Sequence, residues 1–243
     1  MRIVNYKLQV SVITCLLALA SSSAYSAIAL DRTRLVYPGS DKSVTLNIQN
    51  DSREKPYLAQ AWIEDANGKK VISPLSVTPA LQRVEAGKKS IIRVNALPAS
   101  ASLPQDRESL FYFIVKEIPP KSERPNVLQF ALQTKIKVFY RPASVIPPKF
   151  SRQDDKLVLH KANGGYDIEN PTPYYMTVLG VSGSENGKFL KDADPVMVSP
   201  KSKGFIKSEV FNTPYVTTIN DFGGKPSLKF KCSGSVCHAD VKS

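Results

Sequence analysis

The sequence is poor in the residues that most often carry catalysis or bind metals. Its 243 residues include two histidines, three cysteines and one tryptophan. The histidines, His160 and His238, lie in no recognisable hydrolase motif. A phosphate-binding loop of the Walker type is also missing. These shortages argue against an enzyme, and we expect no catalytic residues and no cofactor.

Long apolar runs are missing except near the N-terminus. There Arg2 and Lys7 precede an apolar stretch over residues 10–20, and a run of serine and alanine follows. This order is typical of a secretory signal peptide, and the stretch is shorter than the roughly 20 residues that span a bilayer. A cut after Ser26 would leave small residues, Ala24 and Ser26, at both recognised positions. We therefore predict an exported, soluble product.

Cleavage would also simplify the cysteine count. It would remove Cys15 and leave Cys232 and Cys237. An even pair in an oxidising compartment predicts a disulfide that closes a tight hairpin. A metal site that adds His238 is the alternative, but zinc usually takes three or four protein ligands, and only His160 remains to help. We expect no metal site.

The excess of basic over acidic residues is the remaining unusual feature of the composition. The formal net charge is +12, and loss of Arg2 and Lys7 would lower it to +10. Such a charge suits nucleic acid, a membrane surface or acidic partners, or serves only solubility. The lysines are spread along the chain without a compact basic run, and no later segment is apolar enough to cross a membrane. We expect neither nucleic-acid binding nor a membrane-embedded protein.

Short runs rich in Val, Ile, Tyr, Phe and Thr recur along the chain, and helical periodicity is weak. In residues 43–49 apolar and polar side chains alternate, as on a strand with one buried face. Asn67-Gly68 and Asn163-Gly164 predict hairpin turns, because Asn-Gly tolerates positive φ. The other expected strands cover residues 56–64, 71–73, 90–95, 110–118, 127–140, 156–161, 165–169, 176–181, 204–208, 216–220 and 227–231.

Many short antiparallel strands with little helix predict an all-β protein made of sandwiches. The paired prolines in residues 144–148 indicate a hinge, because they stiffen a connection and cannot lie in a central strand. We predict a signal peptide over residues 1–26 and two domains, 27–146 and 147–243. Both domains are near the ~100 residues of an immunoglobulin-like sandwich.

The longest expected strand, residues 127–140, has one apolar face and one mostly polar face. Glutamines and lysines dominate the odd positions. Such a strand is either a core strand or an exposed edge strand that offers its apolar row to another protein. Composition alone does not decide between the two. The even positions hold Leu128, Phe130, Leu132, Thr134, Ile136 and Val138.

Several longer stretches together resemble the periplasmic pilus chaperones. They cover nearly all of the chain after the predicted signal peptide, in matching order. The resemblance implies two immunoglobulin-like β-sandwich domains in a boomerang arrangement, and a non-enzymatic chaperone in the periplasm. It also implies pilus subunits (pilins and an adhesin) and the outer-membrane usher as partners. The stretches are Leu30-Asp-Arg-Thr-Arg34, Pro56-Tyr-Leu-Ala-Gln-Ala-Trp-Ile-Glu64, Leu103-Pro-Gln-Asp-Arg-Glu-Ser-Leu-Phe-Tyr-Phe113, Leu132-Gln-Thr-Lys-Ile-Lys137, Phe139-Tyr-Arg-Pro142, Ile168-Glu-Asn-Pro-Thr-Pro-Tyr-Tyr175, Asn212-Thr-Pro-Tyr215 and Ile219-Asn-Asp-Phe-Gly-Gly224.

In this family the chaperone lends an edge strand to a subunit that lacks its own last strand. By resemblance the donor strand here would insert Leu128, Phe130 and Leu132 into the subunit. Arg34 and Lys137 match the two basic residues that anchor the subunit's C-terminal carboxylate, for which a guanidinium fork and a compact ammonium are suited. Because Lys137 has the opposite strand parity to the inserted residues, the two functions use different faces unless a bulge intervenes.

Three more charged residues, Glu108, Arg141 and Asp221, match an interdomain cluster of the family that would set the angle between the domains. The connection before the donor strand, residues 119–126, resembles the short-loop branch of the family, which assembles rod-like pili. An exposed apolar edge further predicts that the free chaperone caps itself by forming a dimer.

A different class of function stays open beside the chaperone. A secreted immunoglobulin-like adhesin or binding module would have the same composition and fold class. Such a module would bind carbohydrate or host protein by itself, whereas a chaperone would co-purify with a pilin.

Overall fold

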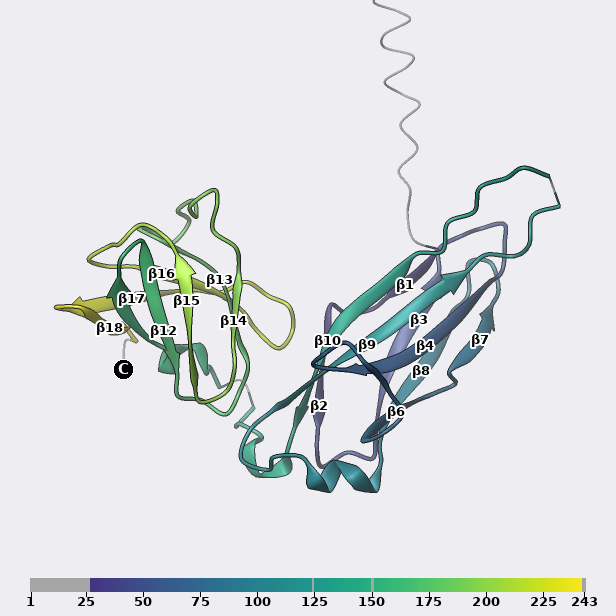
Figure 1. Cartoon of the computed structure of the whole chain (residues 1–243), viewed down its shortest axis with the longest axis horizontal. Coiled ribbons are helices and arrows are strands. Elements are labelled where there is room, and N and C mark those ends of the chain that lie inside the picture. Colours follow the sequence, from purple (N-terminus) through teal and green to yellow (C-terminus); the bar gives the residue numbers. More distant parts are fainter. Residues whose placement is uncertain (1–26, 124, 150, 242–243) are drawn as a thin grey trace, which may run out of the picture.

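A computed structural model describes residues 27–123, 125–149 and 151–241, so the predicted signal peptide lies outside the described residues. These residues form two β-sheet units that meet at an angle (Figure 1). Their helical structure consists of three short 3₁₀ turns, and none of their helices is long and apolar enough to cross a membrane. The predicted all-β fold with two sandwich units is confirmed. The turns are η1 (Pro98–Ser102), η2 (Ala143–Val145) and η3 (Asp154–Lys156).

The N-terminal unit is a sandwich of two sheets. One sheet has the strand order β1-β3-β8-β6, and the other has the order β2-β10-β9-β4-β5, with β7 paired to β4. Their inner faces meet in a buried core that includes Leu46, Ile92, Phe113 and Val138. The strands are β1 (Ile28–Leu30), β2 (Arg34–Pro38), β3 (Ser43–Asn50), β4 (Tyr57–Asp65), β5 (Lys70–Val71), β6 (Leu75–Thr78), β7 (Leu81–Val84), β8 (Lys89–Ala96), β9 (Ser109–Ile118) and β10 (Gln133–Arg141).

The expected strand over residues 127–140 is only half correct, because β10 begins at Gln133. Before it, the Leu132 carbonyl accepts a hydrogen bond from the Glu117 N–H at 3.0 Å, and residues 127–131 lie outside any strand. The physical reason is that β9, the antiparallel partner, ends at Ile118, which by the β9–β10 register would lie opposite residue 131, so that no described strand lies beside residues 127–130. Without a second strand, an alternating sequence has no ladder to join.

The C-terminal unit consists of eight strands in the order β14-β13-β16-β17-β18-β11-β12-β15. A Cβ placed on Gly204 of β15 would lie 3.1 Å from a methyl of Val198 in β14, so the two ends of the sheet come together. Ile168, Val178 and Phe230 lie in the core that this closure creates. The strands are β11 (Val158–Ala162), β12 (Gly165–Asn170), β13 (Met176–Ser182), β14 (Val196–Val198), β15 (Ser202–Lys207), β16 (Tyr215–Ile219), β17 (Ser227–Ser233) and β18 (Val236–Ala239).

The predicted disulfide between Cys232 and Cys237 is present in the β17–β18 hairpin. The two cysteines are register partners, and Gly234, with φ of +63°, provides the left-handed conformation in the turn. Among the described residues, no cluster of three or more His, Cys, Asp or Glu side chains could hold a metal ion.

Replacing both hairpin cysteines by serine should lower the free energy of unfolding of the C-terminal unit by about 2 kcal/mol, because the unfolded chain loses a short closed loop. Calorimetry of the double variant measures this loss. The fluorescence of Trp62, which lies in the N-terminal unit, serves as the internal control and should shift less. Equal thermal stability of variant and wild type would contradict the prediction.

Candidate protein-binding site

One edge of the N-terminal unit is left open because the chain changes sheets near its start. The first strand, β1, pairs with β3 in one sheet, whereas β2 pairs with β10 in the other, in parallel. The β2 pairing covers only the part of β10 from Lys137 to Arg141. The earlier part of β10, residues 133–136, therefore pairs with β9 on one side and with no described strand on the other. A free edge of this kind is a template for another chain.

A row of exposed apolar side chains precedes this open edge. Leu128, Phe130 and Leu132 are 78%, 71% and 44% exposed. They have the same strand parity as Ile136 and Val138, which are buried in the core of the N-terminal unit. The row therefore continues the apolar face of β10 beyond the point where this protein can bury it. Apolar surface so arranged gains free energy when another protein covers it.

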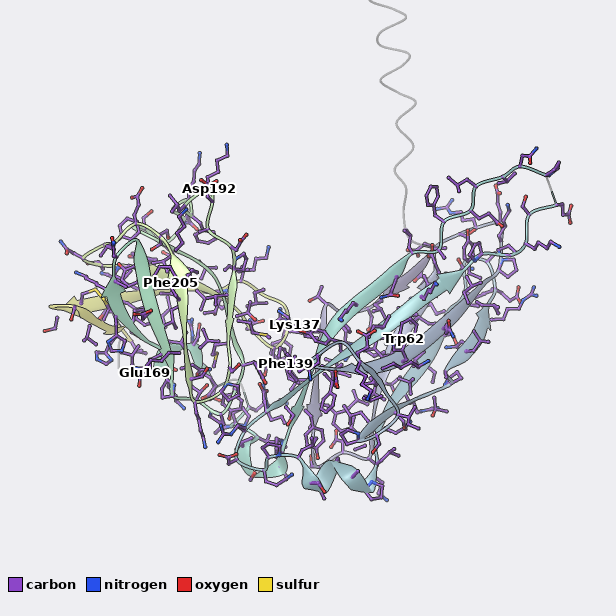
Figure 2. The ribbon with its side chains drawn as sticks, in the orientation of Figure 1. Trp62, Lys137, Phe139, Glu169, Asp192 and Phe205 are labelled. Carbon is purple, nitrogen blue, oxygen red and sulfur yellow. A yellow bond between two sulfur atoms is a disulfide. The ribbon has the colours of Figure 1, made fainter. Side chains whose placement is uncertain are left out.

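Two cations stand side by side where β2 covers β10. Arg34 and Lys137 are register partners on these strands. The Arg34 guanidinium donates a long hydrogen bond of 3.5 Å to the Ile219 carbonyl of the C-terminal unit, and its buried Nε has no hydrogen-bond partner among the described residues. Neither cation forms a salt bridge within the described part of the chain. Figure 2 shows Lys137 on the side of the N-terminal unit that faces the C-terminal unit.

The protein environment disfavours the charge on both cations. Burial lowers the pKa of Arg34, and the charge of Asp221 offsets this only in part. Burial is also the main reason that the pKa of Lys137 is lowered, and the positive charge of Arg34 lowers it further. Two half-buried like charges without a paired acid form a ready site for an anion, and a carboxylate matches both donors.

The three predicted interdomain charges are brought together. Arg141 at the end of β10 donates from Nε to Glu108 Oε1 at 2.8 Å, and its two terminal nitrogens donate to the Asp221 carboxylate at 2.8 and 3.1 Å. The other Glu108 oxygen accepts the Tyr175 N–H at 2.7 Å. Since Asp221 and Tyr175 belong to the C-terminal unit, the cluster joins the two units.

The cluster is less exposed than ordinary surface ion pairs. The side chains of Arg141 and Glu108 are 8% and 1% exposed, whereas Asp221 is 47% exposed. Burial raises the pKa of Glu108, although the Arg141 charge and the Tyr175 N–H oppose this change. A buried pair of this kind is costly to break, because removal of one partner leaves an uncompensated charge.

Further interdomain contacts escaped the sequence analysis, and two of them involve side chains on both units. The rings of Phe139 and Tyr175 stack at 5.6 Å between centroids, and Lys201 pairs with Asp106 at 2.6 Å. Phe139, Tyr175 and Asp106 lie within the stretches that resemble the family, and Lys201 does not. Which of these residues contact one another depends on how the two units meet. No local pattern signals such a pairing.

An immunoglobulin-like pair of units with an open apolar edge and an adjacent cation pair defines a class of proteins that bind others by adding a strand. The comparisons with known proteins agree. Residues 27–146 match the family "Pili and flagellar-assembly chaperone, PapD N-terminal domain", and residues 152–230 match "Pili assembly chaperone PapD, C-terminal domain". The chain belongs to the PapD family of pilus assembly chaperones, which are periplasmic and have no enzymatic activity.

Individual relatives support this assignment over most of the chain. The chaperone protein PapD of Escherichia coli is 54% identical over 89% of this chain and 91% of its own length. The chaperone protein PmfD of Proteus mirabilis is 41% identical over 91% and 89%. Among solved structures, the periplasmic chaperone SfaE has a TM-score of 0.68 at 33% identity, covering 83% of this chain and 98% of the other. A complex of the Salmonella enterica SafA pilin with the SafB chaperone gives 0.71 at 25% identity, covering 87% and 99%.

The buried cluster predicts non-additive losses of stability. Arg141→Met should cost about 3–5 kcal/mol of unfolding free energy, because it leaves the Glu108 carboxylate buried without its cation. Combining it with Glu108→Gln should cost less than the sum of the two single changes. Urea unfolding of the four proteins of this cycle measures the coupling. Lys201→Ala, which removes an exposed ion pair, is the control and should change the free energy of unfolding little. Strictly additive losses in the double variant would refute the buried pairing.

The crowded cations predict a gain in stability on removing one of them. Lys137→Met should raise the melting temperature at pH 7 by up to about 2 °C, a small gain because solvent screens a half-exposed charge. The lowered pKa means that the penalty is present while Lys137 is charged, so the gain should vanish as the pH rises toward the usual value of 10.5. Lys135→Met is the matched control, because Lys135 is paired with Glu64 at 2.6 Å. A loss of stability in Lys137→Met at pH 7 would contradict this reasoning.

Proposed function

We propose that this chaperone completes the fold of pilus subunits by lending them the segment around Leu128, Phe130 and Leu132, and that Arg34 and Lys137 hold the subunit's C-terminal carboxylate. The observation that carries the proposal is the exposed apolar row leading into an open sheet edge, with two adjacent cations at its far end that form no salt bridge among the described residues. On this proposal the subunit is the second strand that residues 127–132 lack.

The two parts of the proposed site divide the work of binding. Backbone hydrogen bonds along the open edge give affinity irrespective of sequence, and the three apolar side chains select a subunit with matching pockets. Complete burial of each such side chain is worth roughly 1.5–3 kcal/mol. The Phe130 ring is the bulkiest of the three, and so it should have the strictest requirement for a pocket.

The cation pair fixes the register of the added strand. Lys137 lies five residues after Leu132, which is about 17 Å along an extended chain. A carboxylate held at Arg34 and Lys137 therefore determines which subunit residues lie opposite the apolar row. Register matters because a shift by one residue would turn the inserted side chains away from the subunit core.

The remaining parts of the proposal concern geometry and partners. Arg141, with Glu108 and Asp221, holds the two units at a set angle, so that the carboxylate site stays open between them. The loaded chaperone delivers pilins and the tip adhesin to the outer-membrane usher. The free chaperone covers its apolar row by pairing with a second copy through the same edge.

The anchor can be tested by co-expression with the pilus subunits of the same bacterium. Arg34→Ala and Lys137→Ala should each reduce the subunit recovered with the chaperone at least tenfold, since hydrogen bonds to charged groups are worth about 1.5–3 kcal/mol. Phe130→Ser should have a similar effect through lost burial. The readout is the subunit co-purified per mole of chaperone from the periplasm.

Two exposed side chains to which the proposal gives no part in binding serve as matched controls. Lys135→Ala removes a lysine from the same strand as Lys137, and Ile72→Ala removes an apolar side chain that is 79% exposed. Both controls should retain the subunit. Normal recovery with both anchor variants would refute the anchor, and normal recovery with Phe130→Ser would refute the donor segment.

A further inference from the structure

The connection between β16 and β17 is a stiff turn. The Gly223 N–H donates to the Asn220 carbonyl, and the Asn220 N–H donates to the Gly224 carbonyl, both at 3.0 Å. The Asn220 side-chain oxygen accepts the N–H groups of Phe222 and Gly224 at 3.1 and 2.8 Å. Gly223 has φ of +83°, which favours glycine. The backbone on both sides of Phe222 is therefore held in place.

This turn projects from the C-terminal unit toward the N-terminal unit (Figure 1). Its first contact is Ile219, whose carbonyl accepts the long hydrogen bond from Arg34. Its second contact is Asp221, which is bound by both terminal nitrogens of Arg141. The turn is thus tied to the same part of the N-terminal unit that carries the cation pair.

A third close approach lies on the other side of Phe222. A Cβ on Gly223 would come within 2.9 Å of the Thr33 hydroxyl, and Thr33 immediately precedes Arg34. Phe222 lies between this approach and Asp221, and at most about 11 Å of chain separate it from Ile219. The backbone that carries Phe222 is therefore fixed on both sides and lies close to Thr33 and Arg34.

The ring itself makes little contact with the rest of the protein. Phe222 is 88% exposed, the highest value among the exposed large apolar side chains of the described residues. A rigidly displayed aromatic side chain is the kind of group that anchors a partner, because it offers a large contact area at a low cost in conformational entropy.

We propose that Phe222 is a third element of the carboxylate site and that its ring packs against the side chain of the subunit's last residue. This inference rests on the proposed function, since the carboxylate of that residue lies on Arg34 and Lys137. The occupant is an extended peptide that ends in a free carboxylate and an apolar or aromatic side chain. The C-terminal unit thereby selects the end of the subunit, whereas the apolar row of the N-terminal unit selects its core.

Fluorescence anisotropy with a pair of labelled peptides tests the proposal. Both are extended decapeptides of alternating threonine and valine with a free carboxylate, one ending in phenylalanine and the other in serine. The wild-type protein should bind the phenylalanine peptide about five- to tenfold more tightly than the serine peptide. Phe222→Ala should abolish this preference and weaken binding of the serine peptide by less than twofold.

The matched control is Phe205→Ala, which removes a partly exposed phenylalanine of the same unit on β15, away from Lys137 (Figure 2). This variant should keep the preference. A wild-type protein with no preference, or a Phe222→Ala variant that retains it, overturns the role of Phe222.

Two further measurements separate this inference from the proposed function. Amidation of the peptide carboxylate and the Arg34→Ala variant should each weaken both peptides by about tenfold or more. If they do so while Phe222→Ala changes nothing, the anchor stands and the role of Phe222 fails. If amidation has no effect on either peptide, the carboxylate anchor itself fails.

Discussion

The first part of β10 has β9 on one side and no described strand on the other, and the rest of the candidate site depends on this constraint. A strand in a sandwich normally satisfies its N–H and C=O groups on both sides. Here β1 pairs in one sheet and β2 in the other, so that β10 is covered only from Lys137 onward. The open backbone edge and the exposed apolar row before Gln133 are two consequences of one topological choice, and a single added strand would cover both.

The N-terminal unit provides the apolar row and the two cations of the candidate site, and the C-terminal unit makes contacts that position them. Arg141 is the last residue of β10 and binds Glu108 on one side and Asp221 on the other. This buried network holds the β16–β17 turn close to Arg34. Because one guanidinium joins both units near the cation pair, the same contacts fix how the two units meet and how the β16–β17 turn lies beside Arg34.

The alternation of apolar and polar residues predicted the longer strands well. It failed for segments that form a strand only when another strand pairs with them. The alternation in residues 43–49 gave β3 nearly to the residue, because a strand with one buried face has a period of two. The short strands β1, β2, β6 and β7 carry too few residues for a pattern and exist because a longer strand pairs with them. Conversely, residues 127–130 have a strand pattern but no described strand beside them, so they join no sheet.

The sequence by itself determined the all-β class, the hairpin disulfide and, through resemblance, the residues of the candidate site. Residue types, their alternation and the spacing of two cysteines are local properties that one chain records directly. Only the tertiary structure decided that Arg34 and Lys137 are register partners, that Glu108 is buried against Arg141, and that the turn carrying Phe222 approaches Thr33 and Arg34. Those facts depend on which strands pair and how two units meet, and such long-range contacts leave no signal in the local sequence.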